Sequence, residues 1–298
     1  MPFLQVHLTL DGLDPDAVEA ACFATGAVSV TLTDAGDTPI LEPLPGATPL
    51  WPATAVAALY EAATPAPELA AALRLALATP ALALRFEQVA DKVWEREWLK
   101  DFKPMRFGQR LWVCPGGMPP SPGSGEQPVI VWLDPGLAFG TGTHATTALC
   151  LEWLDGASLA AARVLDVGCG SGILAIAALR LGAGHAHALD IDPQALTATA
   201  DNAERNAVGD RLSLAPADAA WGTGYEVVLA NILAEPLIKL AAALAAATVA
   251  GGSIVLSGLL ANQAAAVTAA YRPWFDMAVP RERDGWIGLV GRRRPLEA

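Results

Sequence analysis

The sequence predicts an α/β protein with two domains, a small α+β domain followed by a larger domain built on a mostly parallel sheet. Its 298 residues, 53% hydrophobic and 17% charged, are enough for two packed cores. From Arg163 onward, apolar strand patterns alternate with helix patterns, which is typical of a parallel sheet covered by helices on both faces. The first 90 residues instead follow the order βαββαβ, which predicts a ferredoxin-like fold.

The N-terminal elements follow from residue alternation and from helix signals. Residues 3–10 alternate between apolar and polar side chains, which predicts a half-buried strand. Asp14 and Pro15 then provide an N-cap and a first helical residue, and Gly26 ends the helix. Further strands are expected at 28–32, 54–60 and 83–89, with a second helix over 67–78.

Residues 91–103 predict a linker helix, because Trp94 and Trp98 lie one turn apart on one face and Pro104 follows. The expected organisation is therefore an N-terminal domain over 1–90, this linker, and a C-terminal domain over 104–298. The C-terminal domain begins with expected strands at 111–114 and 129–133, separated by a loop rich in glycine, proline and serine.

The main sheet of the C-terminal domain is expected to contain seven strands. Helices between them begin near Gly172, Pro193, Glu235 and Asn262. The last two strands flank a short charged turn, residues 281–284, and should pair antiparallel. The seven strands are expected at 163–167, 186–190, 211–215, 225–231, 253–257, 275–279 and 285–290.

The net charge of −12 is concentrated in the N-terminal domain. Residues 1–90 hold two basic and ten acidic side chains, a balance of −8, whereas the other 208 residues carry −4. An acidic surface favours solubility. It also attracts basic partners and repels nucleic acid. Charge alone leaves both interpretations open.

Composition also indicates a cytoplasmic protein without a metal site. No stretch of about 18 uncharged apolar residues predicts a membrane span, and residues 1–7 lack a signal-peptide pattern. No Cys-x-x-Cys pair is present, so buried free thiols in a reducing compartment are expected. The four cysteines are Cys22, Cys114, Cys150 and Cys169.

The strongest local motif is an apolar strand that enters a glycine turn, with Gly168, Gly170 and Gly172 alternating. Glycines here allow a tight turn and let a ligand approach the backbone. Asp190 ends the next strand, 18 residues after Gly172, where a carboxylate can accept hydrogen bonds from ribose hydroxyls. The sequence therefore predicts a nucleoside-containing ligand at this edge of the sheet.

Four neighbouring polar residues have more than one interpretation. Asp192 precedes Pro193 and is expected to cap a helix rather than to contact the ligand. Asp166 could orient the glycine turn or meet an ammonium group of the ligand. Asp218 follows the third strand and could form a turn. Asn231 ends a central strand, at the edge where open parallel sheets bind ligands, and could contact the ligand or form a turn.

The alternating glycines followed by Asp190 resemble the class I S-adenosylmethionine-dependent methyltransferases. In this superfamily the position of Asp218 often contacts the adenine amino group, which is the alternative to a turn for this residue. Over nearly its whole length the chain resembles one family among them, the bacterial PrmA family, whose members methylate ribosomal protein L-eleven of the large subunit. The motifs that carry the resemblance lie at 94–98, 104–108, 134–147, 165–172, 190–193 and 231–233.

The resemblance implies a class I methyltransferase fold, with a Rossmann-like seven-stranded sheet, its last pair antiparallel, and a small ferredoxin-like domain. It implies S-adenosylmethionine as the cofactor, with Thr147, Gly168, Asp190 and Asn231 at the family's cofactor-contact positions. Asn231 is also expected to be catalytic, because its oxygen can accept a hydrogen bond from the substrate amine. His144 could be a general base or a helix cap.

The resemblance further implies methylation of lysine ε-amino groups and of the N-terminal α-amino group of the L-eleven protein. Residues 1–90 would recognise this basic substrate, and a monomer without nucleic-acid or membrane binding is expected. An RNA or small-molecule methyltransferase is the first alternative, but RNA would favour a basic stripe. A non-catalytic ribosome-assembly binder is the second alternative.

Overall fold

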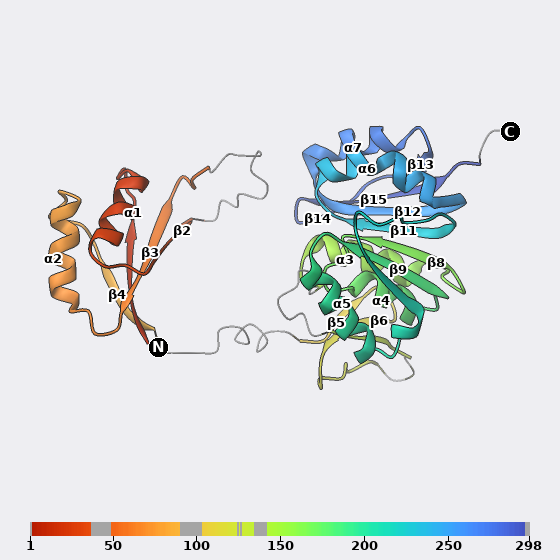
Figure 1. Ribbon diagram of the computed structural model, residues 1–298, viewed down its shortest axis with the longest axis horizontal. Helices are drawn as coiled ribbons and strands as arrows, with labels where there is room; N and C mark the ends of the chain where they lie inside the picture. Colours follow the sequence, from red (N-terminus) through yellow and green to blue (C-terminus); the bar gives the residue numbers. More distant parts are fainter. Residues whose placement is uncertain are drawn as a thin grey trace. The chain divides into compact units, whose positions relative to one another are not determined.

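The computed structural model describes residues 2–36, 49–89, 103–123, 125, 127–133 and 142–295. The chain forms two compact units, residues 1–94 and 95–298 (Figure 1). The expected linker helix lies outside the described residues except for Lys103, and so does the loop at 134–141.

The N-terminal unit is a four-stranded antiparallel sheet with two helices, which confirms the ferredoxin-like expectation. The sheet order is β2-β3-β1-β4. Asp14 caps α1 as expected, because its carboxylate accepts a hydrogen bond from Ala17 N at 3.2 Å. The elements are β1 (Phe3–Thr9), α1 (Pro15–Ala24), β2 (Ser29–Asp34), β3 (Thr54–Glu61), α2 (Ala66–Ala76) and β4 (Arg85–Val89).

Alternation along the strands produces the core of this unit. Buried and half-buried residues alternate along β1 and β3, so one face of the sheet is apolar and covered. Val18 of α1 and Leu73 of α2 are fully buried against that face. Burying side chains of this size contributes about 1.5–3 kcal/mol each.

The main sheet of the second unit has the order β10-β9-β8-β11-β12-β15-β13, with β14 also paired to β15. The first five strands of this order are parallel, and β15 pairs antiparallel with β12, β13 and β14. Its strands are β8 (Arg163–Val167), β9 (His185–Asp190), β10 (Leu212–Pro216), β11 (Tyr225–Asn231), β12 (Thr248–Leu260), β13 (Phe275–Met277), β14 (Arg281–Arg283) and β15 (Trp286–Arg293).

The expectation of seven strands with a charged turn at 281–284 was wrong in one element. Arg281–Arg283 is strand β14, and the chain reverses at Asp284 and Gly285, whose φ angles are 51° and 78°. Arg281 and Arg283 both contact Glu152, at 3.1 and 2.7 Å, so the backbone can pair with β15 while these charges remain partnered. The antiparallel pairing of the last expected strands is confirmed.

Helices cover both faces of this sheet (Figure 1). One core cluster includes side chains of α3 and α4, and the other includes those of α6 and α7. Helix α3 was not expected, whereas the other four begin within two residues of their expected starts. The helices are α3 (Ala145–Gly156), α4 (Ile173–Arg180), α5 (Pro193–Arg205), α6 (Ala234–Ala247) and α7 (Ala264–Tyr271).

A small sheet precedes α3 and is attached to it. Its strands are β5 (Met105–Phe107), β6 (Leu111–Pro115) and β7 (Val129–Leu133), in the order β5-β6-β7. β5 was not expected. The buried Asp155 of α3 accepts a hydrogen bond from Gln109 N at 2.6 Å and fixes the β5–β6 turn to the helix.

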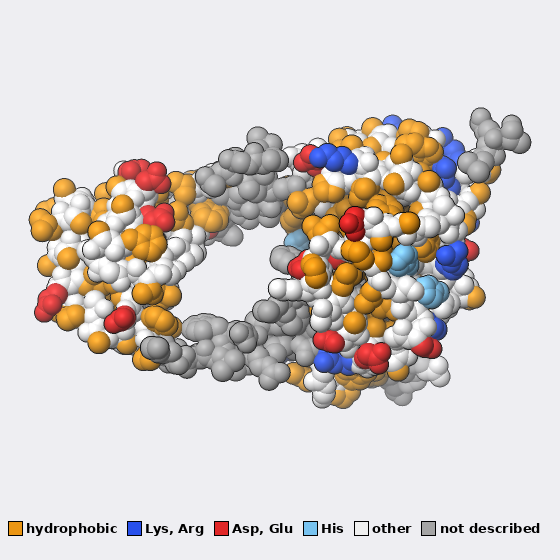
Figure 2. Space-filling view, viewed as in Figure 1, with side chains coloured by type: hydrophobic (Ala, Val, Ile, Leu, Met, Phe, Trp, Pro, Cys, Tyr) orange, Lys and Arg blue, Asp and Glu red, His pale blue; other side chains and the backbone are white. Residues whose placement is uncertain are grey.

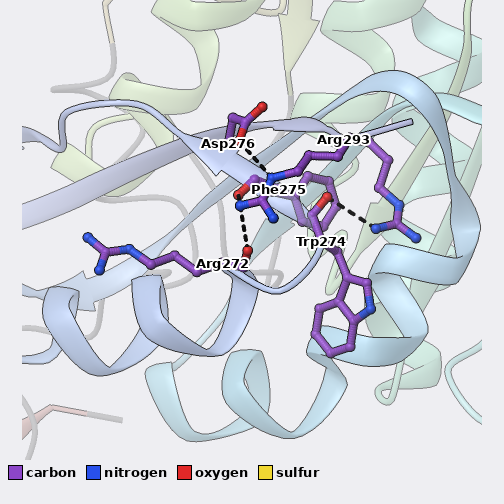
Figure 3. Close-up of polar contacts among 6 residues, drawn as sticks. Arg272, Trp274, Phe275, Asp276 and Arg293 are labelled. Carbon is purple, nitrogen blue, oxygen red and sulfur yellow. Dashed lines mark hydrogen bonds and ion pairs between the residues drawn. The ribbon is translucent and has the colours of Figure 1, made fainter. Parts of the chain in front are cut away.

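The end of β15 is tied to the connection between α7 and β13. Arg293 donates to the carbonyl oxygen of Trp274 at 3.1 Å (Figure 3). Arg294 donates to Asp276 at 2.7 Å and to the carbonyl oxygen of Arg272 at 2.8 Å, just after the last residue of α7. A cation near a helix C-terminus interacts favourably with the helix dipole, so these contacts stabilise the edge of the sheet.

Candidate active site

The expected site residues lie at the carboxyl edge of the parallel strands. Gly168 follows β8, Asp190 ends β9 and Asn231 ends β11. β8 lies between β9 and β11 in the sheet, so the three ends are neighbours. This is the edge at which open parallel sheets bind their ligands.

The glycine turn needs its glycines. Gly168, Gly170 and Gly172 have φ angles of 77°, 55° and 77°, a left-handed conformation that other residues adopt only with strain. A Cβ added at Gly172 would lie 2.6 Å from Cγ2 of Thr199, whose hydroxyl donates to the carbonyl oxygen of Gly170 at 2.9 Å. The turn is therefore closely packed against Thr199, while Gly168 and Gly170 are only half-buried.

Asp190 is half-buried and holds the turn in place. One carboxylate oxygen accepts from Gly170 N at 2.9 Å, and the other accepts from Asp192 N at 3.0 Å. An ionised carboxylate offers about four acceptor sites. Each oxygen can therefore take one more hydrogen bond, which suits the two hydroxyls of a ribose.

Asp166 of β8 is buried beside the start of α4, the helix that follows the glycine turn. It has no exposed surface, and its Oδ2 accepts from Ala175 N in the first turn of α4 at 3.1 Å. The N-cap of α4, Gly172, has no side chain, so Asp166 satisfies an amide that would otherwise lack a partner. Burial raises the pKa of this carboxyl to about 7. Of its two expected roles, orienting the turn agrees with this complete burial.

Asn231 is held by α3. Its Nδ2 donates to the hydroxyl of Thr147 at 3.3 Å, and Thr147 is only 3% exposed. Because this amide nitrogen is used, the side-chain oxygen of Asn231 is the atom left to accept a hydrogen bond from a substrate amine. The structure therefore brings Thr147 to Asn231, while the cofactor contact of Thr147 stays a prediction.

The remaining candidates have local structural roles. His144 is the N-cap of α3: its Nδ1 lies 2.7 Å from the hydroxyl of Thr146, and its ring meets Trp286 edge-on at 4.7 Å. Asp192 caps α5 as expected, accepting from Gln194 N at 2.8 Å. Asp218 is exposed in a turn closed by the hydrogen bond from Ala219 N to Pro216 O, 3.0 Å long.

Ile232 is the site residue that sequence reasoning missed. It was part of a motif, but no role was assigned to it. Its side chain lies against Gly168, where an added Cβ would overlap its Cγ2. Positions 168 and 232 are far apart in the sequence, and only the pairing of β8 with β11 brings them together.

S-adenosylmethionine fits the residues present. Gly168 and Gly170 of the glycine turn are only half-buried, and the carboxylate of Asp190 has unused acceptor sites. The residues that directly precede Gly168 and Asn231 pair with each other in the sheet. When bound, this cofactor supplies a methyl group on a sulfonium. Within the described residues, no cluster of three or more histidine, cysteine or carboxylate side chains could hold a metal ion.

Fold and site together define a class I S-adenosylmethionine-dependent methyltransferase. Residues 2–294 match the family "Ribosomal protein L11 methyltransferase (PrmA)", and the chain belongs to this family. It is 50% identical over 300 residues to the ribosomal protein L11 methyltransferase of Sodalis glossinidius, covering 99% of this chain and 100% of the relative. A relative from Serratia proteamaculans with the same name is 50% identical over 297 residues, with the same coverage.

A solved structure agrees with the fold. The ribosomal protein L11 methylase of Lactobacillus delbrueckii subsp. bulgaricus matches with a TM-score of 0.59 and 32% identity, over 65% of this chain and 100% of that one. In the part of the chain that the structure describes, no helix is long and apolar enough to cross a membrane.

Proposed function

We propose that this protein transfers methyl groups from S-adenosylmethionine to lysine ε-amino groups and to the N-terminal α-amino group of ribosomal protein L11. Membership of the family supports the substrate. The geometry of Asn231 is the observation that supports methylation of an amine. Its amide nitrogen is bound to Thr147, so its oxygen is left to accept a hydrogen bond from an amine beside the glycine turn.

The reaction requires a neutral amine in line with the methyl group. The nitrogen lone pair forms the new N–C bond as the C–S bond breaks, so the proton must leave the amine first. At pH 7 this costs about 4.6 kcal/mol for a lysine and about 1–1.4 kcal/mol for an α-amine. Burial beside a positive sulfonium would lower the pKa of either amine. Asn231 then orients the amine, and the proton passes to water without a dedicated base.

Substrate recognition belongs, in this proposal, to residues 1–90, joined by a linker over 91–103 to a catalytic domain over 104–298. A balance of −8 supports a basic protein partner. On the face shown in Figure 2, the described part of the N-terminal unit displays acidic side chains and neither lysine nor arginine. The same charge disfavours RNA as the substrate.

The proposed setting is the cytoplasm, with the protein acting as a monomer. All four cysteines are buried and free, which agrees with a reducing compartment. Burial raises the pKa of the Cys150 and Cys169 thiols to about 12, so these two groups stay protonated and unreactive at pH 7.

The test is incubation of the purified protein with methyl-labelled S-adenosylmethionine and total ribosomal protein and RNA. We expect label in one small basic protein, on lysines and on the N-terminus, as located by mass spectrometry. Label in RNA would favour the RNA methyltransferase alternative. A protein that binds the cofactor but labels nothing would favour the non-catalytic binder.

A further inference from the structure

Ile232 lies between two glycines that leave no space for a side chain of their own. On one side, a Cβ added at Gly168 would overlap Cγ2 of Ile232. On the other side, a Cβ added at Gly258 would lie 2.9 Å from Ile232 N and 2.8 Å from its carbonyl carbon. The side chain of Ile232 therefore contacts the glycine turn, and its backbone contacts β12.

Neither flank of Ile232 is free to move. Gly168 N donates to Leu189 O at 2.8 Å, which fixes the turn to β9. Gly258 has a φ of 87° and follows Ser257, whose hydroxyl donates to Ile287 O at 2.9 Å. Ile232 is thus packed between two segments that the sheet already holds.

Ile232 also follows Asn231 directly. The backbone of Asn231 pairs with Ser257, and its side chain is bound by Thr147. The pairing of β11 with β8 ends one residue before Asn231, and just beyond it Cγ2 of Ile232 lies against Gly168. This contact therefore bears on the separation between the Asn231 segment and the glycine turn past the end of the paired strands. In a transfer reaction, a misplacement of about 1 Å can cost about 10²-fold in rate.

We propose that Ile232 is a positioning residue that sets the gap between the glycine turn and Asn231. It does so through the Cγ2 methyl group of its branched side chain, and not through the total volume of that side chain. This inference rests on the proposed function, because the gap is read from the rate of methyl transfer. Ile232 itself forms no bond with substrate or cofactor in this role.

The side chains of related residues separate branching from volume. Valine is smaller than isoleucine but keeps a methyl group at the Cγ2 position, and branching at Cβ keeps χ1 stiff. Leucine has as many carbons as isoleucine but no branch at Cβ. Alanine has neither the branch nor the volume. Threonine keeps the Cγ2 methyl group and is as small as valine, but it carries a hydroxyl.

The experiment compares Ile232→Val, Ile232→Leu, Ile232→Ala and Ile232→Thr in the full-length protein. Single-turnover methylation of ribosomal protein L11 is measured at saturating S-adenosylmethionine, together with the Kd of the cofactor and the Tm. We expect the valine variant within about twofold of wild type, and the leucine and alanine variants slower by about 10- to 100-fold at saturating cofactor.

The order of the methylation rates of the variants tests the proposal. A leucine variant at the wild-type rate beside a slow valine variant would show that volume matters, and it would overturn the positioning role. If the leucine variant does not fold, threonine serves instead: a folded threonine variant should stay close to valine, and a rate near that of alanine overturns the role. Wild-type protein that labels no ribosomal amine would overturn the proposed function as well, so the two failures are distinguishable.

Discussion

Replacing Asp190 by alanine should weaken cofactor binding by an amount that the structure bounds. The carboxylate already accepts from Gly170 N and Asp192 N, and it has one further acceptor site on each oxygen. Hydrogen bonds to a charged group contribute about 1.5–3 kcal/mol each. Two such bonds would sum to about 3–6 kcal/mol. Because Asp190 is only half-buried and water competes for its carboxylate, we expect less than this sum, about 2–3 kcal/mol, or about 30- to 150-fold in Kd.

Titration calorimetry with S-adenosylmethionine measures this loss, and Asp192→Ala is the matched control. Asp192 lies two residues away and caps α5 through Gln194 N. Its removal should cost about 0.5–2 kcal/mol of stability and leave the Kd nearly unchanged. If a folded Asp190→Ala protein bound S-adenosylmethionine with wild-type affinity, Asp190 would not be a cofactor-binding residue. Equal weakening in both variants would instead point to a general loss of local structure.

Three further predictions concern catalysis, recognition and pH. Asn231→Ala should lower single-turnover methylation by about 10²-fold even at saturating cofactor; recovery at high cofactor would show a binding role instead. Deleting residues 1–90 should abolish methylation of ribosomal protein L11 while calorimetry still detects cofactor binding, and full activity would place recognition elsewhere. Burial raises the pKa of Asp166 from 3.8 to about 7, so the native state binds this proton more tightly than the unfolded state. Stability should therefore fall as pH rises from 3.8 to about 7 and then level off. Urea denaturation at several pH values should show a weaker dependence of stability on pH in Asp166→Asn than in wild type. An unchanged pH dependence would show that Asp166 is not its source.

Elements with regular alternation could be predicted from the sequence, whereas elements stabilised by distant partners could not. The parallel strands were predictable because their apolar runs are bounded by glycine and by polar residues. Strand β14 consists of three charged residues, and it is a strand only because β15 pairs with it and Glu152 binds both of its arginines. Helix α3 begins after His144, which is not among the residues that commonly cap helices.

The candidate site shows the same division. Gly168, Asp190 and Asn231 could be expected together, since the carboxyl ends of parallel strands share one edge. The contact between Asn231 and Thr147 and the packing of Ile232 between two glycines depend on the register of strands and helices. Such contacts join residues distant in the sequence, and no local pattern predicts them.

Helix α3 mechanically connects three parts of the second unit. Thr147 near its start binds Asn231, Glu152 binds two arginines of β14, and Asp155 near its end holds the β5–β6 turn. Thr147 and Asp155 are about 12 Å apart along the helix axis, at about 1.5 Å per residue. Because the helix behaves as a stiff rod, a displacement along its axis moves the hydroxyl at Asn231 and the carboxylate at the small sheet together. The alignment of the catalytic amide is therefore linked to strands that lie outside the main sheet.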